Sequence, residues 1–149
     1  MDIPLRTYAT MQDRPAPLCY SRTWDNGVSS IGDARDAVAD LLGRARPTPD
    51  RRSVQDAQLV VSELVTNAAK HAPGPCALRL ELLPGSTALR VCVTDTSGEP
   101  LRQRPPDPRR VGGHGLRLVS KLAAALEVTR LARGKRVTAT VPLTGATAL

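Results

Sequence analysis

The sequence contains no phenylalanine, and aromatic residues make up only 2% of its 149 residues. Because 41% of the residues are hydrophobic, we expect a core built from Leu, Val, Ile and Ala. A chain of this length suits one domain with a buried core. The scarcity of aromatic rings also removes the platforms on which bases stack in many single-strand nucleic-acid-binding proteins.

Long apolar runs and paired cysteine motifs are missing as well. No run approaches the roughly 18 apolar residues that a membrane-spanning helix needs, and the start of the chain, with acidic Asp2, lacks the apolar stretch of a signal peptide. Cys19, Cys76 and Cys92 are odd in number and far apart, which disfavours a zinc site. These absences favour a cytoplasmic protein whose thiols stay reduced.

Long runs of positive charge are absent too, although the formal net charge is +7. No Lys/Arg run is longer than pairs such as Arg51-Arg52 and Arg109-Arg110. A basic protein of this kind can bind nucleic acid, and that hypothesis predicts salt-dependent DNA binding. Scattered arginines without aromatic partners instead favour a solvated surface that faces acidic partners or phosphates.

Hydrophobic periodicity divides the chain into helices and strands. Alternating patterns predict strands at 18–24, 76–83, 87–95, 126–131 and 135–143. Apolar residues at helical spacing predict helices at about 31–45, 50–72 and 114–126.

These elements indicate a two-layer α/β sandwich, in which helices cover one face of a mixed, mainly antiparallel sheet. The segment 96–112 is rich in Pro and Arg and lacks periodicity, which predicts a functional loop or lid. We expect a flexible N-terminal tail at 1–16, one domain at 17–143 and a C-terminal tail at 144–149.

One predicted helix carries three polar side chains in a line. In LVVSELVTNAAKHA (59–72), Glu63, Asn67 and His71 are four residues apart and share one edge beside the apolar stripe. Such a line is typical of a helix edge that faces water. A Glu at the boundary with a sheet would instead lose hydration and need a ligand, a metal or a hydrogen-bond network. The spacing alone leaves both interpretations open.

A carboxylate is predicted to point into the protein at the end of one strand. In ALRVCVTD (88–95), Leu89, Val91 and Val93 alternate, and Asp95 continues the same parity. Its side chain therefore faces the core, where it can accept a hydrogen bond from an amino group. The alternative is an Asp that caps its own turn, since Asp is among the commonest turn residues.

A glycine-rich segment, GGHGLRLV (112–119), precedes the last predicted helix. Its glycines allow a ligand to approach the backbone, and the free N–H groups at a helix start favour an anion. Lys70, Arg109 and Arg110 add positive charge, which favours phosphate. A flexible hinge would give the same pattern.

The order of these motifs resembles the Bergerat-fold ATPase superfamily (gyrase, Hsp90, histidine kinase and MutL type). It is most similar to the bacterial anti-sigma-factor serine/threonine kinases, which carry a histidine-kinase-like ATPase domain. The matching stretches are SELVTNAAKHA at the N box, VTDTSGEP and GGHGLRLV at the two glycine boxes, and GKRVTATVPL at the closing strand. The resemblance covers roughly 17–143 and implies the Bergerat ATP-binding fold.

The resemblance implies a role for each site residue. Glu63 would be the general base that deprotonates the attacking hydroxyl. Asn67 would hold Mg²⁺. Asp95 would accept a hydrogen bond from the amino group of adenine. An Asn oxygen one turn from a carboxylate suits a metal ligand beside a base. The other nucleotide-binding positions that the resemblance implies are Lys70, His71, Gly98, Gly113, His114, Gly115, Leu116 and Thr138.

Three positions depart from the family pattern. Ser97 and Glu99 occupy the usual glycine positions of the first glycine box, with Gly98 between them. Val137 stands where many relatives have Thr, and Thr138 follows it. The fold implied by the resemblance does not depend on these positions, but ATP affinity and turnover do.

The resemblance implies an ATP-dependent serine/threonine kinase that regulates transcription by partner switching. Such a protein would bind a sigma factor in one state and phosphorylate an anti-sigma antagonist in another, and relatives of this type often form homodimers. The altered first glycine box favours an alternative, an ATP-sensing protein-interaction module of the same fold without kinase activity.

Overall fold

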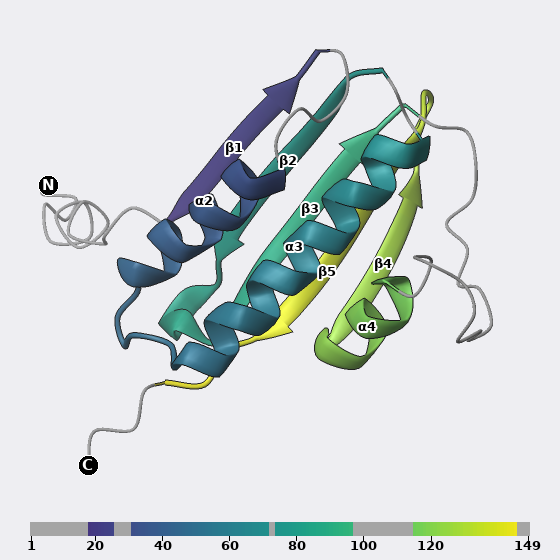
Figure 1. Cartoon of the computed structure of the whole chain (residues 1–149). Coiled ribbons are helices and arrows are strands. Elements are labelled where there is room, and N and C mark those ends of the chain that lie inside the picture. Colours follow the sequence, from purple (N-terminus) through teal and green to yellow (C-terminus); the bar gives the residue numbers. More distant parts are fainter. Residues whose placement is uncertain (1–17, 26–30, 72–73, 97–114, 146–149) are drawn as a thin grey trace, which may run out of the picture.

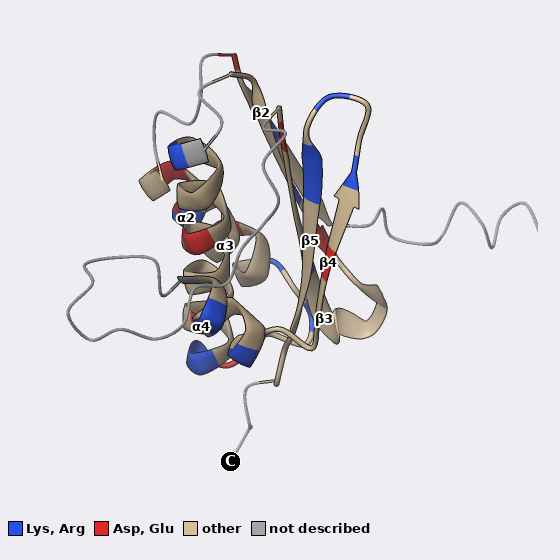
Figure 2. Ribbon diagram, turned by 90° about the vertical axis from the view of Figure 1, so that its right-hand side faces the viewer, with Lys and Arg blue, Asp and Glu red and all other residues tan. Residues whose placement is uncertain are grey.

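The computed structural model describes residues 18–25, 31–71, 74–96 and 115–145. In these ranges three α-helices cover one face of a five-stranded sheet, as Figures 1 and 2 show from two directions. The strand order is β1-β2-β3-β5-β4, and each neighbouring pair is antiparallel. The predicted two-layer sandwich is confirmed, with a sheet that is antiparallel throughout the described residues and not mixed.

The elements follow the predicted order. In the chain they are β1 (Cys19–Trp24), α2 (Ile31–Gly43), α3 (Arg51–His71), β2 (Cys76–Leu82), the short 3₁₀ helix η1 (Pro84–Ser86), β3 (Ala88–Asp95), α4 (Gly115–Leu122), β4 (Ala125–Arg130) and β5 (Lys135–Pro142). The expected tail at 1–16 and the loop at 97–112 lie outside the described residues.

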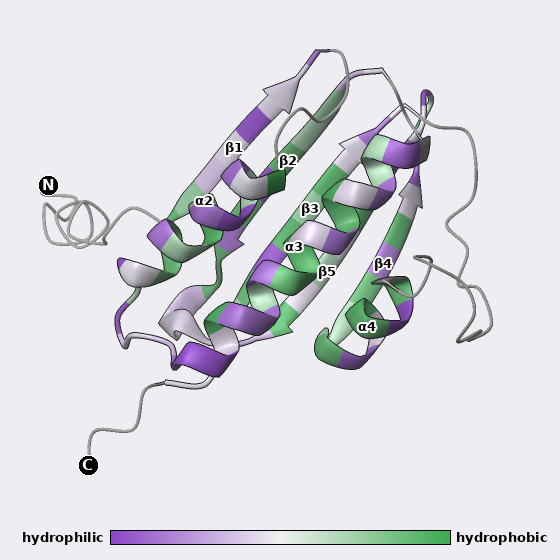
Figure 3. Cartoon of the chain, viewed as in Figure 1, coloured by the Kyte–Doolittle hydropathy of each residue, from purple (hydrophilic) through white to green (hydrophobic). Residues whose placement is uncertain are grey.

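The core between the helices and the sheet is almost wholly aliphatic, with Trp24 as its one aromatic side chain in the described ranges. Figure 3 shows hydrophobic and hydrophilic residues interspersed along α3. The apolar stripe predicted for α3 is confirmed, because its members are at most 2% exposed: Ala57, Val60, Val61, Leu64, Val65 and Ala68. Burial of this stripe fixes α3 across the sheet and so determines which edge of the helix remains open to a ligand.

The start of α3 is tied to the end of the described chain. The Asp50 carboxylate accepts a hydrogen bond from the Ser53 amide at 2.8 Å, as a helix N-cap does. The Asp50 amide donates to the Thr144 carbonyl at 2.7 Å, and the Ser53 hydroxyl accepts from the Thr144 amide at 2.8 Å. Ordered contacts therefore extend beyond residue 143, where we expected the domain to end.

The last helix is shorter than predicted. We expected it to run to residue 126, but α4 ends at Leu122 and β4 begins at Ala125. Alanine favours helix by propensity, yet the Ala124 amide donates to the Thr140 carbonyl, and Ala125 pairs with Thr140. Pairing with β5 outweighs the local preference here. Among the described residues, no helix has both the length and the apolar character that a membrane crossing demands.

Candidate functional site

The polar line of α3 lies half-buried beside the core stripe. Glu63 and Asn67 are each of intermediate exposure, one helical turn apart, while Lys70 is exposed. His71 is the last residue of α3, and its side chain lies outside what the structure describes. Neither Glu63 nor Asn67 bonds through its side chain to any part of the described chain. Partial burial leaves their oxygen atoms within reach of a ligand or of water, so both interpretations of this helix edge stay open.

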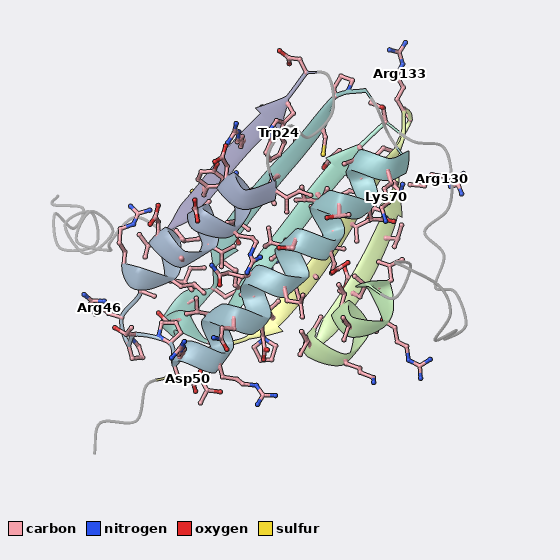
Figure 4. All side chains as sticks on the ribbon, viewed as in Figure 1. Trp24, Arg46, Asp50, Lys70, Arg130 and Arg133 are labelled. Atoms are coloured by element: carbon pink, nitrogen blue, oxygen red, sulfur yellow. The ribbon has the colours of Figure 1, made fainter. Side chains whose placement is uncertain are left out.

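A row of four buried residues crosses one end of the sheet. Trp24 of β1 pairs with Cys76 of β2, Cys76 with Asp95 of β3, and Asp95 with Lys135 of β5. Each residue of the row is at most 5% exposed. Figure 4 shows Trp24 at the same end of the molecule as Lys70, in the last turn of α3. The row and the C-terminal end of α3 thus bound one region between the two layers.

The centre of this row is a buried ion pair. The Lys135 Nζ atom lies 3.1 Å from Asp95 Oδ2 and donates a hydrogen bond to Asp95 Oδ1 at 3.3 Å. The prediction that Asp95 faces the core is confirmed by its exposure of 2%. Sequence analysis missed Lys135, although the alternation of β5 puts it on the same side as buried Val137 and Ala139.

The thiol beside the ion pair is uncharged. The pKa of Cys76 is raised from 9.0 to about 11, mainly because the side chain is buried and also because the negative charge of Asp95 lies beside it. A protonated Cys76 and the Trp24 ring form the apolar neighbours of the charged pair. Trp24 Nε1 is buried and has no hydrogen-bond partner in the ranges that the structure describes.

The turn between β4 and β5 is packed directly against the backbone of Asp95. Gly134 has φ of 90°, and a Cβ atom added there would lie 1.9 Å from the Asp95 carbonyl oxygen and 2.6 Å from the Thr96 Cα. Only glycine fits at this contact, because any side chain would overlap with backbone atoms. Gly134 therefore holds the end of β3, and with it the Asp95 carboxylate, in place.

Gly134→Ala is expected to lower the free energy of unfolding by more than about 2 kcal/mol. A positive φ alone costs an L-residue roughly 1–2 kcal/mol, and the overlap with Asp95 adds to this cost. Gly43→Ala is a matched control, because a Cβ atom there would meet nothing within 4 Å. Urea denaturation of both variants measures the difference, and an equal midpoint for the two would contradict the contact.

Thr138 does not join this site. It pairs with Cys92, and its hydroxyl lies 3.6 Å from the Cys92 sulfur on the face of the sheet that the helices leave uncovered. Both residues line a shallow hollow of about 490 Å³ on that face. The expectation that Thr138 binds the nucleotide is therefore corrected: a shift of one residue along β5 places it on the opposite side from Asp95.

The glycine-rich segment is described only in part. Gly115 begins α4, and Leu116 is half-buried against the hydrophobic core. The other expected residues of the two glycine boxes, Gly98, Gly113 and His114, lie outside the described residues. Within the described residues α4 extends from Gly115 to Leu122, and anion binding by the glycine-rich segment stays a prediction.

Positive charge is not confined to one layer of the described chain. Figure 2 shows Lys and Arg on the helices as well as on the strands and the β4–β5 turn. A protein that relies on the DNA backbone for affinity gathers its positive charges on the surface that faces the phosphates. The observed distribution gives the nucleic-acid hypothesis no support.

Comparisons with known proteins agree with this architecture. The model of the histidine kinase-like ATPase domain family matches residues 26–141. The fold is similar to the crystal structure of the RsbU and RsbW domains of Rv1364c from Mycobacterium tuberculosis, with a TM-score of 0.63 and 20% identity over 88% of this chain. It is also similar to the blue-light activated histidine kinase EL346 of Erythrobacter litoralis, with a TM-score of 0.50 and 27% identity over 76% of this chain.

These matches define the family but not the whole-protein activity. The aligned regions cover only 33% and 40% of the two solved chains, and no curated protein matches significantly. The family model, however, spans most of the sequence, including α3 with its polar line and the β3–β5 ion pair. The chain therefore belongs to the histidine kinase-like ATPase domain family.

Proposed function

We propose that this chain is an ATP- and Mg²⁺-binding serine/threonine protein kinase of the anti-sigma-factor type. It would phosphorylate an anti-sigma antagonist and bind a sigma factor, and so regulate transcription by partner switching. The observation that carries the proposal is the placement of Glu63 and Asn67. Each is half-buried on α3 without a side-chain partner in the described residues, at the spacing that a base and a metal ligand require.

Glu63 is assigned the role of general base. Its carboxylate would accept the proton of a serine or threonine hydroxyl while the hydroxyl oxygen bonds to the γ-phosphorus of ATP. The bond between that phosphorus and the bridging oxygen breaks, and ADP leaves with the electron pair. Partial burial suits this role, because it limits competition from water for the carboxylate.

The residues of the site fit Mg²⁺ as it is usually bound in phosphoryl-transfer enzymes. Mg²⁺ takes few protein ligands, keeps several waters and is held largely by substrate phosphates. Asn67 supplies one neutral oxygen, and the described residues contain no cluster of three or more His, Cys, Asp or Glu that would form an all-protein cage. Asn67 would hold the ion, which when bound would supply positive charge that offsets the phosphates.

The nucleotide would lie between the end of α3 and the start of α4. Asp95 is assigned to the adenine ring, because its buried carboxylate can accept a hydrogen bond from the amino group of adenine. Gly115 is assigned to the phosphates, because the N–H groups at the start of α4 favour an anion. Exposed Lys70 adds a positive charge near this region of α3.

The partner proposal rests on the N-box resemblance and on the shared fold. SELVTNAAKHA is the stretch most similar to the anti-sigma-factor kinases. The solved structure from Mycobacterium tuberculosis contains an RsbW domain of the same fold. A small kinase of this type would recognise its sigma factor and its antagonist as folded proteins.

A second candidate is an ATP-sensing interaction module without kinase activity. The specific observation in its favour is that Ser97 and Glu99 replace the two usual glycines after Asp95. A carboxylate near a triphosphate would repel it, which disfavours turnover more than it affects the base-binding end of the site. Titration with ATP and Mg²⁺, followed by transfer of labelled γ-phosphate to a panel of small antagonist proteins, separates the candidates. ATP binding without labelling of any antagonist favours the module, and absence of ATP binding contradicts both.

Asn67→Ala is expected to weaken ATP binding about tenfold when Mg²⁺ is present, because it removes a ligand to a charged ion. The affinity for ATP without Mg²⁺ should change by less than about threefold, since Asn67 is assigned to the Mg²⁺ ion and not to adenine. Thr66→Ala is the control, because Thr66 is also half-buried in the same turn of α3. Calorimetry with and without Mg²⁺ tests the assignment, which fails if Asn67→Ala weakens both titrations equally.

A further inference from the structure

The charge beside Asp95 is the feature of the site that the proposed function does not use. Lys135 is 5% exposed and contacts both carboxylate oxygens of Asp95. An ammonium group has three N–H donors. Two contacts with one carboxylate use at most two of them, so at least one donor remains for a group that lies beside the carboxylate.

Stability alone does not account for a buried pair at this position. Replacing a buried ion pair with apolar residues of similar volume is often neutral or stabilising, because both charges lose their hydration. The rest of this face of β5 is apolar, since Val137, Ala139 and Val141 continue the parity of Lys135 toward the other end of the strand. The positive charge of Lys135 thus lies only at the end of β5, beside the Asp95 carboxylate of β3 that is assigned to adenine.

The pair presents a fixed acceptor next to a fixed donor. Adenine offers the complementary arrangement, because its N6–H donor adjoins its N1 acceptor. Hypoxanthine in the same position presents its O6 acceptor to the carboxylate and its N1–H donor to the ammonium, so both contacts are repulsive. The carboxylate opposes O6 and the ammonium opposes N1–H, so the pair separates the two bases at two adjacent atoms.

We propose that Lys135 and Asp95 together form the base-reading pair of the nucleotide site. Asp95 accepts from an N–H group of the base, and Lys135 donates to the neighbouring acceptor. Lys135 is thus a specificity-determining residue, and the site favours a 6-aminopurine triphosphate over a 6-oxopurine triphosphate. This inference rests on the proposed function only in so far as the chain binds a nucleotide at Asp95.

Three nucleotides test the proposal on the wild-type protein by calorimetry with Mg²⁺: ATP, ITP and 1-deaza-ATP, which keeps the amino group but lacks the N1 acceptor. We expect ITP to bind at least about tenfold more weakly than ATP, because both of its contacts with the pair are mismatched. We expect 1-deaza-ATP to bind at least about tenfold more weakly than ATP, because it would leave a buried charged donor without its acceptor. Equal binding of 1-deaza-ATP and ATP, or equal binding of ITP and ATP, would overturn the proposal.

Lys135→Met should change both ratios. In this variant 1-deaza-ATP and ATP should bind within about threefold of each other. The preference for ATP over ITP should fall at least about threefold, because only the carboxylate still opposes the hypoxanthine edge. Arg136→Met is the matched control, because Arg136 is the next residue, is exposed and lines the opposite face of the sheet. It should keep the wild-type ratios, and the same change of ratios in both variants would contradict a specific role for Lys135.

The outcomes separate this inference from the proposed function. If none of the three nucleotides binds, the proposed ATP-binding function fails as well. If ATP binds but the ratios do not depend on Lys135, only the base-reading pair is wrong. Should Lys135→Met fail to fold, the comparison of the three nucleotides on the wild-type protein still decides, because it requires no variant.

Discussion

Glu63→Gln is expected to lower γ-phosphoryl transfer by about 10²–10⁴-fold, the range that a positioned general base contributes. Glutamine keeps the size of the side chain and a hydrogen-bonding oxygen, but it cannot take up the proton of the attacking hydroxyl at neutral pH. ATP affinity should change by less than about threefold, since the carboxylate acts on the hydroxyl and not on the nucleotide. The separation of transfer from binding is the signature of a base.

The measurement is transfer of labelled γ-phosphate from ATP to the antagonist protein that the wild type labels best, with ATP affinity determined in parallel. Asp56→Asn is the control, because Asp56 lies on the same edge of α3 two turns earlier and its loss removes the same charge. This control should retain wild-type transfer. Wild-type transfer by Glu63→Gln would remove Glu63 from the mechanism.

Most of the fold could be predicted from the sequence because its signals are local. The alternation in ALRVCVTD and the apolar stripe of α3 each report which side chains are buried, and the structure confirms both. The end of α4 could not be predicted in the same way. Ala123, Ala124 and Ala125 favour a helix by propensity, and only pairing with Thr140, fifteen residues further along, converts this segment into the start of β4.

The candidate site was predictable where a polar residue continued an apolar pattern. Asp95 stood out because it follows Leu89, Val91 and Val93 at the same parity. Lys135 has the same parity relation to Val137, but a lysine at the start of a strand is normally solvated, so its local pattern does not indicate burial. Its burial depends on Asp95, which is 40 residues away in the chain.

The Asp95–Lys135 pair is expected to be the most sensitive polar contact of the fold. Lys135→Met or Asp95→Asn should each lower the free energy of unfolding by about 3–5 kcal/mol, because the remaining charge stays buried without its counter-charge. Small domains are stable by only about 5–15 kcal/mol, so either change would remove a large share of the total. Urea denaturation in the absence of nucleotide measures this effect independently of any activity.

The double variant Asp95→Asn/Lys135→Met distinguishes a lost pair from lost packing. With both charges removed, no buried ion remains, so the double variant should be more stable than either single variant, with a coupling that a double-mutant cycle measures directly. Arg52 and Asp56 provide the matched control, because their side chains are 84% and 30% exposed and 3.9 Å apart. The same cycle on this exposed pair should give less than about 0.5 kcal/mol. Additive losses at Asp95 and Lys135 would mean that each side chain stabilises the fold through packing alone, and the contact between β3 and β5 would then not depend on charge.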